Sequence, residues 1–288
     1  MKNEQNVPQV RFKGFTDAWE QRELGEVVTV GNGMDYKELG EGDIPVYGTG
    51  GYMLSVDKAL SYDKDAVGIG RKGTIDKPYI LKAPFWTVDT LFYCIPKENY
   101  YLDFVFGIFQ NINWKQKDES TGVPSLSKVN INSTEISSPS LTEQQQIGSY
   151  FRNLDNLITL HQRKCETLQK LKKSMLQKMF PKNGSLYPEI RFAGFTDAWE
   201  QRELKSITSV ITKGTTPLDK SNSGVVNFIK VENIDNSSGE ISISQKISIE
   251  EHEGYLKRSQ LQENDILFSI AGTLGRVTSV NTSVWSSP

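Results

Sequence analysis

The chain has 288 residues, of which 37% are hydrophobic and 10% aromatic, an ordinary globular composition long enough for about two domains. Its formal net charge of -2 and isoelectric point near 5.9 argue against a protein that coats nucleic acid through bulk charge, because neutralising phosphates needs clustered Lys and Arg. No run approaches the ~20 apolar residues that span a bilayer, and the polar N-terminus lacks a signal-peptide core. We therefore expect a cytoplasmic protein without membrane contact.

Cysteine and histidine give no sign of a metal site. Cys94 and Cys165 lie far apart in unlike contexts, which predicts two reduced thiols and no disulfide. His161 and His252 each lack a second ligand at metal spacing. We expect no metal in this chain.

A long internal repeat organises the chain. RFKGFTDAWEQREL at 11–24 returns as RFAGFTDAWEQREL at 191–204, with 13 of 14 positions identical. Pro8 and Pro188 precede the two copies at the same offset. A repeat of this length marks a structural unit that is used twice, so we expect two equivalent domains.

Weaker similarity continues downstream of each copy. GTI at 73–75 aligns with GTL at 272–274, and on this register Trp86 falls on Trp285. The second copy then stops near the equivalent of Asp89. We therefore expect an incomplete second domain with exposed sheet edges and an unfilled core.

Short strands and turns are predicted before residue 142. The segments IPVYG, AVGIG, PYIL and TLFYCI are rich in β-branched and aromatic residues and are separated by turn signals. The stretch 101–113 has the apolar spacing of a helix. We expect an α+β fold, with a mainly antiparallel sheet in a first domain over 1–141, a long helix over 142–182 and an incomplete second domain over 183–288.

Residues 142–182 carry the pattern of one long helix. Thr142 followed by Gln145 is a capping box, and the helix must end at Pro181. Roughly 39 helical residues span about 58 Å, a length that needs a partner along the apolar stripe. The stripe has coiled-coil spacing, so these residues are expected to contact a partner helix: Ile147, Phe151, Leu154, Ile158, Leu168 and Leu171.

A glycine motif is the strongest sign of an enzyme. Gly68-Ile-Gly-Arg-Lys-Gly73 spells the G-x-G-x-x-G of dinucleotide sites. Pro78 and strand-like residues stand where a helix should receive the pyrophosphate, which argues against such a site. The chain also lacks a P-loop, a G-x-S-x-G elbow and the Asn/Asp-Pro-Pro-aromatic motif of base methyltransferases. A nucleotide-binding enzyme stays open as an alternative.

The same loop is basic, and its glycines would let it approach a DNA duplex closely. Arginine and lysine contact guanine edges or phosphates, and threonine contacts either. The candidate DNA contacts in this loop are Arg71, Lys72, Thr74 and Lys77. An ordinary hairpin with solvated lysines is the alternative interpretation.

The repeat, the long helix and the basic loop together resemble the specificity (S) subunits of type I restriction-modification enzymes. Each target recognition domain of that family opens with P-x-[VI]-R-F-x-G-F-x-x-x-W-[EK]-x-x-x-L, a motif present at 8–24 and 188–204. It closes with a serine/glycine loop, a proline and an E-Q-x-x-I helix start, as at 120–127, Pro139 and 143–147. The resemblance covers nearly the whole chain.

The resemblance implies a non-catalytic subunit whose recognition domains each read one half of a bipartite target in double-stranded DNA. It implies a modification (methyltransferase) subunit and a restriction subunit as partners, and these would carry S-adenosylmethionine, ATP and Mg, so that this chain needs no cofactor. It adds candidate DNA contacts in the serine/glycine loop and in the second domain: Ser120, Thr121, Ser125, Ser127, Lys213, Thr215, Lys230 and Arg276.

The incomplete second copy leaves two hypotheses open. In the first, residues 1–182 form a half-subunit whose helix pairs with that of a second copy, and the antiparallel dimer reads a symmetric target. In the second, the chain is an interrupted product that is inactive until the missing part is restored. A coiled-coil adaptor without DNA contacts is a rival from another class.

Overall fold

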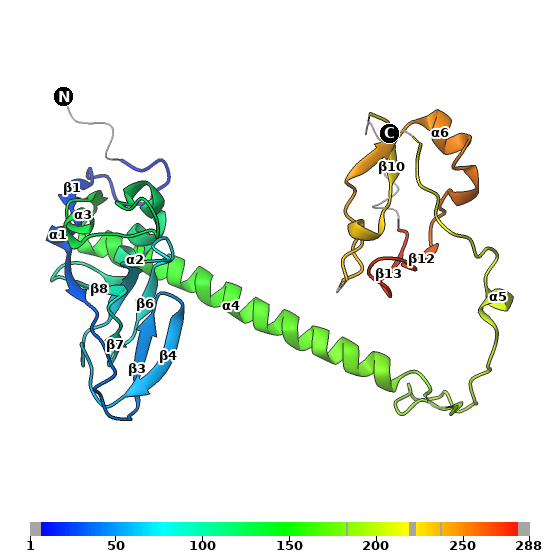
Figure 1. Ribbon diagram of the computed structural model, residues 1–288, viewed down its shortest axis with the longest axis horizontal. Helices are drawn as coiled ribbons and strands as arrows, with labels where there is room; N and C mark the ends of the chain where they lie inside the picture. The colour runs from blue at the N-terminus through cyan, green and yellow to red at the C-terminus, as the bar shows by residue number, and fades with distance from the viewer. Residues whose placement is uncertain (1–6, 183, 219–222, 237, 282–288) are drawn as a thin grey trace. The chain divides into compact units, whose positions relative to one another are not determined.

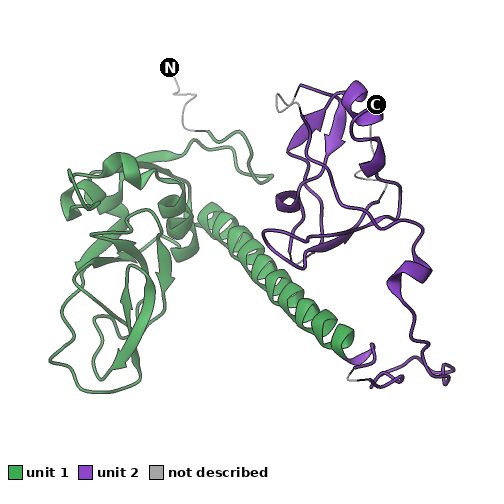
Figure 2. Cartoon of the chain, turned by 45° about the vertical axis from the view of Figure 1, so that its right-hand side comes forward, with its two compact units in different colours: residues 1–177 green, residues 178–288 purple. Residues whose placement is uncertain are grey.

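The computed structural model describes residues 7–182, 184–218, 223–236 and 238–281 (Figure 1). Trp285, on which the weaker repeat register was extended, lies outside the described residues. Contacts between Cα atoms divide the chain into unit 1, residues 1–177, and unit 2, residues 178–288 (Figure 2).

Unit 1 is α+β with two main sheets and mainly antiparallel pairing, as the sequence predicts. The larger sheet has the order β2-β8-β5-β6, with bounds Val28–Asn32, Leu91–Pro96, Ala66–Gly70 and Tyr79–Leu81. The smaller sheet has the order β4-β3-β7, with bounds Gly51–Val56, Ile44–Gly48 and Trp86–Thr87. β3 pairs with β7 in parallel, and the other pairs are antiparallel.

The core of unit 1 lies where helix α2 (Leu102–Asn111) covers strand β5. Every residue of β5 is buried, because the strand is paired on both edges and covered by α2. Val105 and Phe109 are both 0% exposed on the helix. The helix predicted over 101–113 is therefore confirmed, and its apolar face packs on the sheet.

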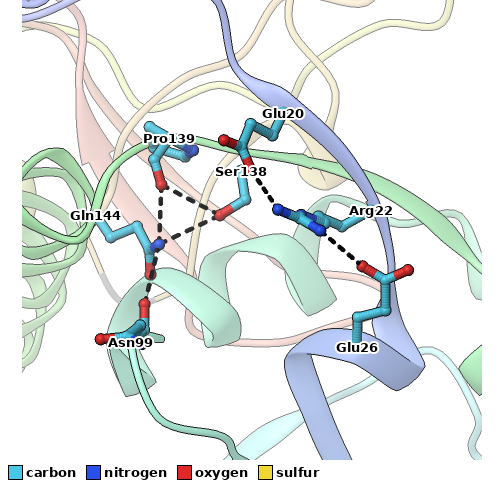
Figure 3. Close-up of polar contacts among 7 residues, drawn as sticks. All are labelled: Glu20, Arg22, Glu26, Asn99, Ser138, Pro139 and Gln144. Carbon is cyan, nitrogen blue, oxygen red and sulfur yellow. Dashed lines mark hydrogen bonds and ion pairs between the residues drawn. The ribbon is translucent and has the colours of Figure 1, made fainter.

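The opening segment and the end of unit 1 meet in a third, two-stranded sheet. β1 (Glu20–Glu23) pairs antiparallel with β9 (Glu135–Ser138). The short helices α1 (Leu24–Val27) and α3 (Lys128–Asn132) pack together beside this sheet, and a 3₁₀ turn, η2 (Trp114–Lys117), follows α2. Arg22 lies between the carboxylates of Glu20 and Glu26 at 2.5 and 3.3 Å (Figure 3).

Helix α4 runs from Leu141 to Lys178, which is 38 residues and about 57 Å. It begins one residue before the expected cap Thr142, so Thr142 lies inside the first turn and the predicted capping box is wrong. Instead, the backbone N–H of Gln144 donates to the carbonyl of Ser140 at 3.0 Å.

The start of α4 is fastened to unit 1 by a buried amide. Gln144 is 2% exposed, and its Nε2 donates to Ser138 Oγ at 3.2 Å and to the carbonyl of Pro139 at 3.0 Å (Figure 3). The same nitrogen lies 3.4 Å from the Asn99 carbonyl, and Oε1 accepts from the backbone N–H of Tyr101 at 3.1 Å. A buried amide with all these partners fixes the direction in which the helix leaves the unit.

Unit 2 has two small hairpin sheets in its described part. One pairs β10 (Val226–Phe228) with β11 (Gln245–Ile247), and the other pairs β12 (Ile266–Phe268) with β13 (Val277–Ser279). Its helical elements are short: α5 (Leu204–Ile207), α6 (Ile249–Glu253), η3 (Val231–Asn233) and η4 (Lys257–Ser259).

The second hairpin of unit 2 repeats β5 and β6 of unit 1. With an offset of 199 residues (272 minus 73), the pair Ile266↔Ser279 falls on Val67↔Ile80, and both pairs exist in the structure. In unit 1 the other edge of β5 is covered by β8, whereas in the described part of unit 2 β12 pairs with β13 alone. Phe268 on β12 is accordingly 61% exposed.

Candidate nucleic-acid interface

Two loops that are far apart in sequence are joined along their backbones in unit 1. The glycine loop after β5 and the serine/glycine loop form an isolated bridge between Lys72 and Ser125. The N–H of Gly73 donates to the carbonyl of Pro124 at 2.8 Å, and the N–H of Leu126 donates to the carbonyl of Arg71 at 2.9 Å. These hydrogen bonds hold the two loops as one surface.

The serine/glycine loop is also tied together from within by Asp118. One oxygen of its carboxylate accepts from the backbone N–H of Ser125 at 2.9 Å, and from the N–H and Oγ of Ser120 at 3.0 and 2.9 Å. These hydrogen bonds favour the charged form and hold the pKa of Asp118 below its ordinary value. The loop is therefore organised around an ionised carboxylate at neutral pH.

A groove lies between the two loops and brings together six of the eight residues predicted in unit 1. They are Arg71, Lys72, Ser120, Thr121, Ser125 and Ser127. Other residues that line it were not predicted: Asn32, Asp89, Thr90, Phe92, Glu119, Gly122, Val123, Leu126 and Lys128. Lys128 is an exposed cation directly after Ser127, and its place next to the serine/glycine loop in the sequence could have suggested it.

Arg71 is positioned at the wall of this groove. Its backbone N–H donates to the carbonyl of Thr90 at 2.8 Å, and its Nη1 lies 3.4 Å from the carbonyl of Asp89. The guanidinium carbon lies 5.9 Å from the centre of the Phe92 ring. An arginine held over an aromatic face and still exposed to solvent suits contact with a planar base edge or a phosphate.

Thr74 and Lys77 are exposed but do not line the groove, and the DNA contacts of all eight residues stay predictions. Ser127 lines the groove, but its hydroxyl is already engaged in hydrogen bonds within the protein. Its Oγ accepts from the backbone N–H of Asn130 at 3.0 Å, capping α3, and lies 3.1 Å from a carboxylate oxygen of Glu119. We assign Ser127 a structural role in positioning the loop.

The candidates in unit 2 have other surroundings. Arg276 donates from Nη1 to the carbonyls of Ile234 and Val231 at 2.6 and 3.2 Å, so it is engaged by the main chain of its own unit. Thr215 and Lys230 line a mostly apolar cavity between the hairpins. Lys213 is exposed.

The glycine motif serves the loop and not a nucleotide. Gly68 and Gly70 lie inside β5, and no helix follows Gly73 before Pro78. A Cβ on Gly70 would lie 2.0 Å from the carbonyl oxygen of Thr74, and Gly73 has a φ of +92°. Both glycines are needed for the tight turn, so the geometry gives no support to a dinucleotide site.

Within the described ranges, no group of three or more His, Cys, Asp or Glu side chains is arranged to hold a metal ion. None of the helices among those residues has the length and hydropathy to cross a membrane.

The predicted partner face of α4 is largely exposed to solvent in the single chain. Ile147, near the start of the helix, is half-buried, whereas Phe151, Ile158 and Leu168 are 50, 54 and 53% exposed. Leu154 and Leu171 are exposed to 36 and 50%. The structure thus leaves this apolar stripe exposed, and its contact with a partner helix stays a prediction.

An α+β scaffold that presents two joined loops around a groove with cations and hydroxyls defines a candidate DNA-recognition module. The family described as the type I restriction modification DNA specificity domain matches residues 16–170 and 196–287, which is most of the chain. The chain therefore belongs to this family of DNA specificity domains, whose members are not catalytic.

The individual relatives share low sequence identity with this chain and match only part of it. The type I restriction enzyme MjaVIII specificity subunit of Methanocaldococcus jannaschii is 29% identical over 99 residues, which cover 33% of this chain and 23% of that protein. The solved S subunit from M. genitalium is 19% identical, with a TM-score of 0.45 over 57% of this chain and 46% of that one. The HsdS subunit from Thermoanaerobacter tengcongensis is 15% identical, with a TM-score of 0.41 over 60% and 47%. The chain thus spans less than half the length of each relative.

Proposed function

We propose that the chain is the specificity subunit of a type I restriction-modification complex, and that unit 1 reads one half-site in double-stranded DNA through the groove between its two loops. The joined pair of loops carries this proposal. It places the cations Arg71 and Lys72 next to the hydroxyls of Ser120, Thr121 and Ser125 on one exposed surface.

The chemistry of this groove suits the edges and backbone of a duplex. Arginine and lysine bind the acceptors of guanine or a phosphate, and hydroxyls donate or accept at either. Glu119 and Asp89 also line the groove, so the charge there is mixed and binding cannot rest on bulk attraction alone. A mixed surface favours selection among sequences over sequence-independent coating.

The resemblance to S subunits supports the remaining parts of the proposal. A modification subunit and a restriction subunit would assemble on the chain in the cytoplasm and supply S-adenosylmethionine, ATP and Mg. This chain would bring DNA recognition and no cofactor. Helix α4 carries an exposed apolar stripe, which is available for a helical partner.

The partner helix that we propose is α4 of a second copy. Two antiparallel copies would place two unit 1 grooves at opposite ends of a rod of about 57 Å. Such a dimer would read a bipartite target with symmetric halves. The contrasting hypothesis, an interrupted and inactive product, predicts no target at all.

Mapping of methylated bases in cells that express the chain with its modification subunit tests the proposal. A bipartite methylated site with two symmetric halves is the expected result. Loss of that site with R71A/K72A, while complex assembly persists, would assign recognition to the groove. Methylation at no defined sequence would overturn the proposal and favour the inactive product.

A further inference from the structure

The first opening segment, residues 11–24, is docked on the start of α4. Arg11 donates from Nε and Nη2 to the two carboxylate oxygens of Glu143 at 2.6 and 2.7 Å. Trp19 Nε1 lies 3.4 Å from the same carboxylate, and the Trp19 ring meets the edge of Phe104 with 5.9 Å between centres. Phe12 makes a similar contact with Tyr150 at 5.8 Å.

The C-terminal part of this segment is docked as well. β1 pairs with β9, and the N–H of Leu24 donates to the carbonyl of Thr134 at 2.9 Å. Leu24 is 0% exposed. We call the receiving surface the socket, and define it by Phe104, Glu143, Tyr150 and strand β9.

The second opening segment, residues 191–204, has the same side chains at every position that contacts the socket. The two segments differ at Lys13, which is Ala193 in the second, and Lys13 is exposed. The physical chemistry of docking is therefore the same for both segments.

In unit 2 the apolar side chains of the second opening segment are largely exposed, although the Trp199 ring meets the edge of Phe180 with 5.7 Å between centres. Phe192 and Phe195 are 71 and 67% exposed, and Leu204, the equivalent of buried Leu24, is 64% exposed. In the described part of the unit, no carboxylate receives Arg191 as Glu143 receives Arg11. The described residues thus contain two opening segments but a socket for only one of them.

The linker between α4 and the second opening segment is too short to bring that segment to the socket of its own chain without full extension. Glu143 and Lys178 are separated by about 53 Å of helix at 1.5 Å per residue. The 13 residues from Lys178 to Arg191 reach about 45 Å when fully extended. Such extension would also break the hydrogen bond from the Ile190 N–H to the Lys178 carbonyl, which is 3.0 Å long.

We propose that the second opening segment docks on the socket of a second copy of this chain, in exchange with that copy's own first opening segment. This proposal rests on the antiparallel pairing of α4 proposed above. In that arrangement the end of one α4 lies beside the start of the other, so the hydrogen bond between Ile190 and Lys178 holds the second segment close to the partner's socket.

Tethering decides which segment occupies a socket, because the side chains are the same. The first segment is tethered to its own unit, and the second is brought to the partner's socket by pairing of the helices. If docking of the first segment is weakened in one copy, the second segment of the other copy must therefore occupy that socket more often.

Cross-linking between chains tests the exchange. Two differently tagged chains are co-expressed, one with F192C and the other with Y150C, both with C165S because Cys165 is exposed. Cys94 is retained, because its thiol is buried and burial raises its pKa, which keeps it protonated and unreactive. A chain with F12C and Y150C together is the internal control for a short bis-maleimide reagent.

We expect a cross-linked heterodimer from the F192C and Y150C chains. Its yield should rise several-fold when R11A is added to the Y150C chain, and fall when R191A is added to the F192C chain. No heterodimer, even with R11A and with the internal control cross-linked, overturns the exchange. Light scattering of the same sample then shows whether the α4 pair itself forms, and DNA binding through the groove is scored separately.

Discussion

Glu143 accepts two hydrogen bonds from Arg11, which lies 132 residues away in the chain, and the Glu143 side chain is 1% exposed. This ion pair joins the opening segment to the first turn of α4. Together with Gln144 it fixes the helix to the unit that carries the groove. A loose joint at this point would let the groove swing relative to any partner bound along the helix.

Glu143→Ala should lower the free energy of unfolding of unit 1 by about 3 kcal/mol, because it leaves a partly buried guanidinium without its partner. Urea unfolding monitored by tryptophan fluorescence measures the change. Glu20→Ala is the control, since its ion pair with Arg22 is exposed to solvent, and it should shift stability by less than about 0.5 kcal/mol. Equal effects of the two substitutions would contradict this account of Glu143.

Gly148→Ala should destabilise the packing of α4 on α2. A Cβ at Gly148 would lie 2.7 Å from the backbone nitrogen of Phe104, so the two helices must separate, at a cost of about 1–3 kcal/mol. Gly107→Ala on α2 is the control, because nothing lies within 4 Å of its Cβ position. That change should stabilise the chain by about 0.5–1 kcal/mol through helix propensity, and thermal unfolding of both variants compares the signs.

Arg71→Ala with Lys72→Ala should weaken specific DNA binding by the assembled complex by about 2 kcal/mol, roughly 30-fold. The two cations line the groove and are exposed, so thermal stability should change little. Fluorescence anisotropy with the mapped target gives the affinity. Lys37→Ala with Lys58→Ala removes two exposed cations outside the groove and should leave the affinity unchanged; unchanged binding by the R71A/K72A variant would support the coiled-coil adaptor instead.

Asp118→Ala should loosen the serine/glycine loop in a pH-dependent way. The folded state holds the pKa of Asp118 below its ordinary value through hydrogen bonds from Ser125 and Ser120, so its stabilising effect is present above about pH 4 and is lost as pH falls through the lowered folded pKa. The Tm of the variant should lie below that of the native chain at pH 7, and the difference should shrink toward pH 3. A constant difference over this range would show that the carboxylate charge is not the cause.

Phe151→Lys with Ile158→Lys should prevent α4 from pairing. Both side chains lie on the exposed apolar stripe, and two buried cations facing a second stripe would be left unpaired. Light scattering should then give a monomer where the native chain gives a dimer. Asn153→Lys, on the opposite side of the same helix, should leave the dimer intact; a native chain that is monomeric at micromolar concentration would remove the basis for pairing.

The sequence predicted the elements whose pattern is local. The strand segments IPVYG and AVGIG, the helix in 101–113 and the long helix all lie where periodicity and propensity place them. The helix cap was misplaced, because Thr142 satisfies a capping motif while the tertiary hydrogen bonds of Gln144 decide where the helix starts. Packing overrode the local signal.

The sequence indicated which types of residue form the site, but not how the two loops that carry them are arranged. The basic glycine loop and the serine/glycine loop were both singled out, but their joining depends on backbone hydrogen bonds such as Gly73 to Pro124, which no spacing rule encodes. Asn32 and Thr90 reach the groove from strand ends through the fold alone. The role of Ser127 as the cap of α3 was not predicted, because it depends on where α3 begins, and its DNA contact stays a prediction.

The open strand edge of unit 2 has a consequence for how the chain survives in the cell. The described part of unit 2 buries four large apolar side chains, Ile234, Ile247, Leu256 and Val280, whereas one cluster in unit 1 contains fifteen buried residues. Opening of unit 2 therefore costs less free energy, and proteases that capture open states should cut there first. Degradation would proceed from the weak half toward α4, and the fragment that lasts longest would be the groove with its helix.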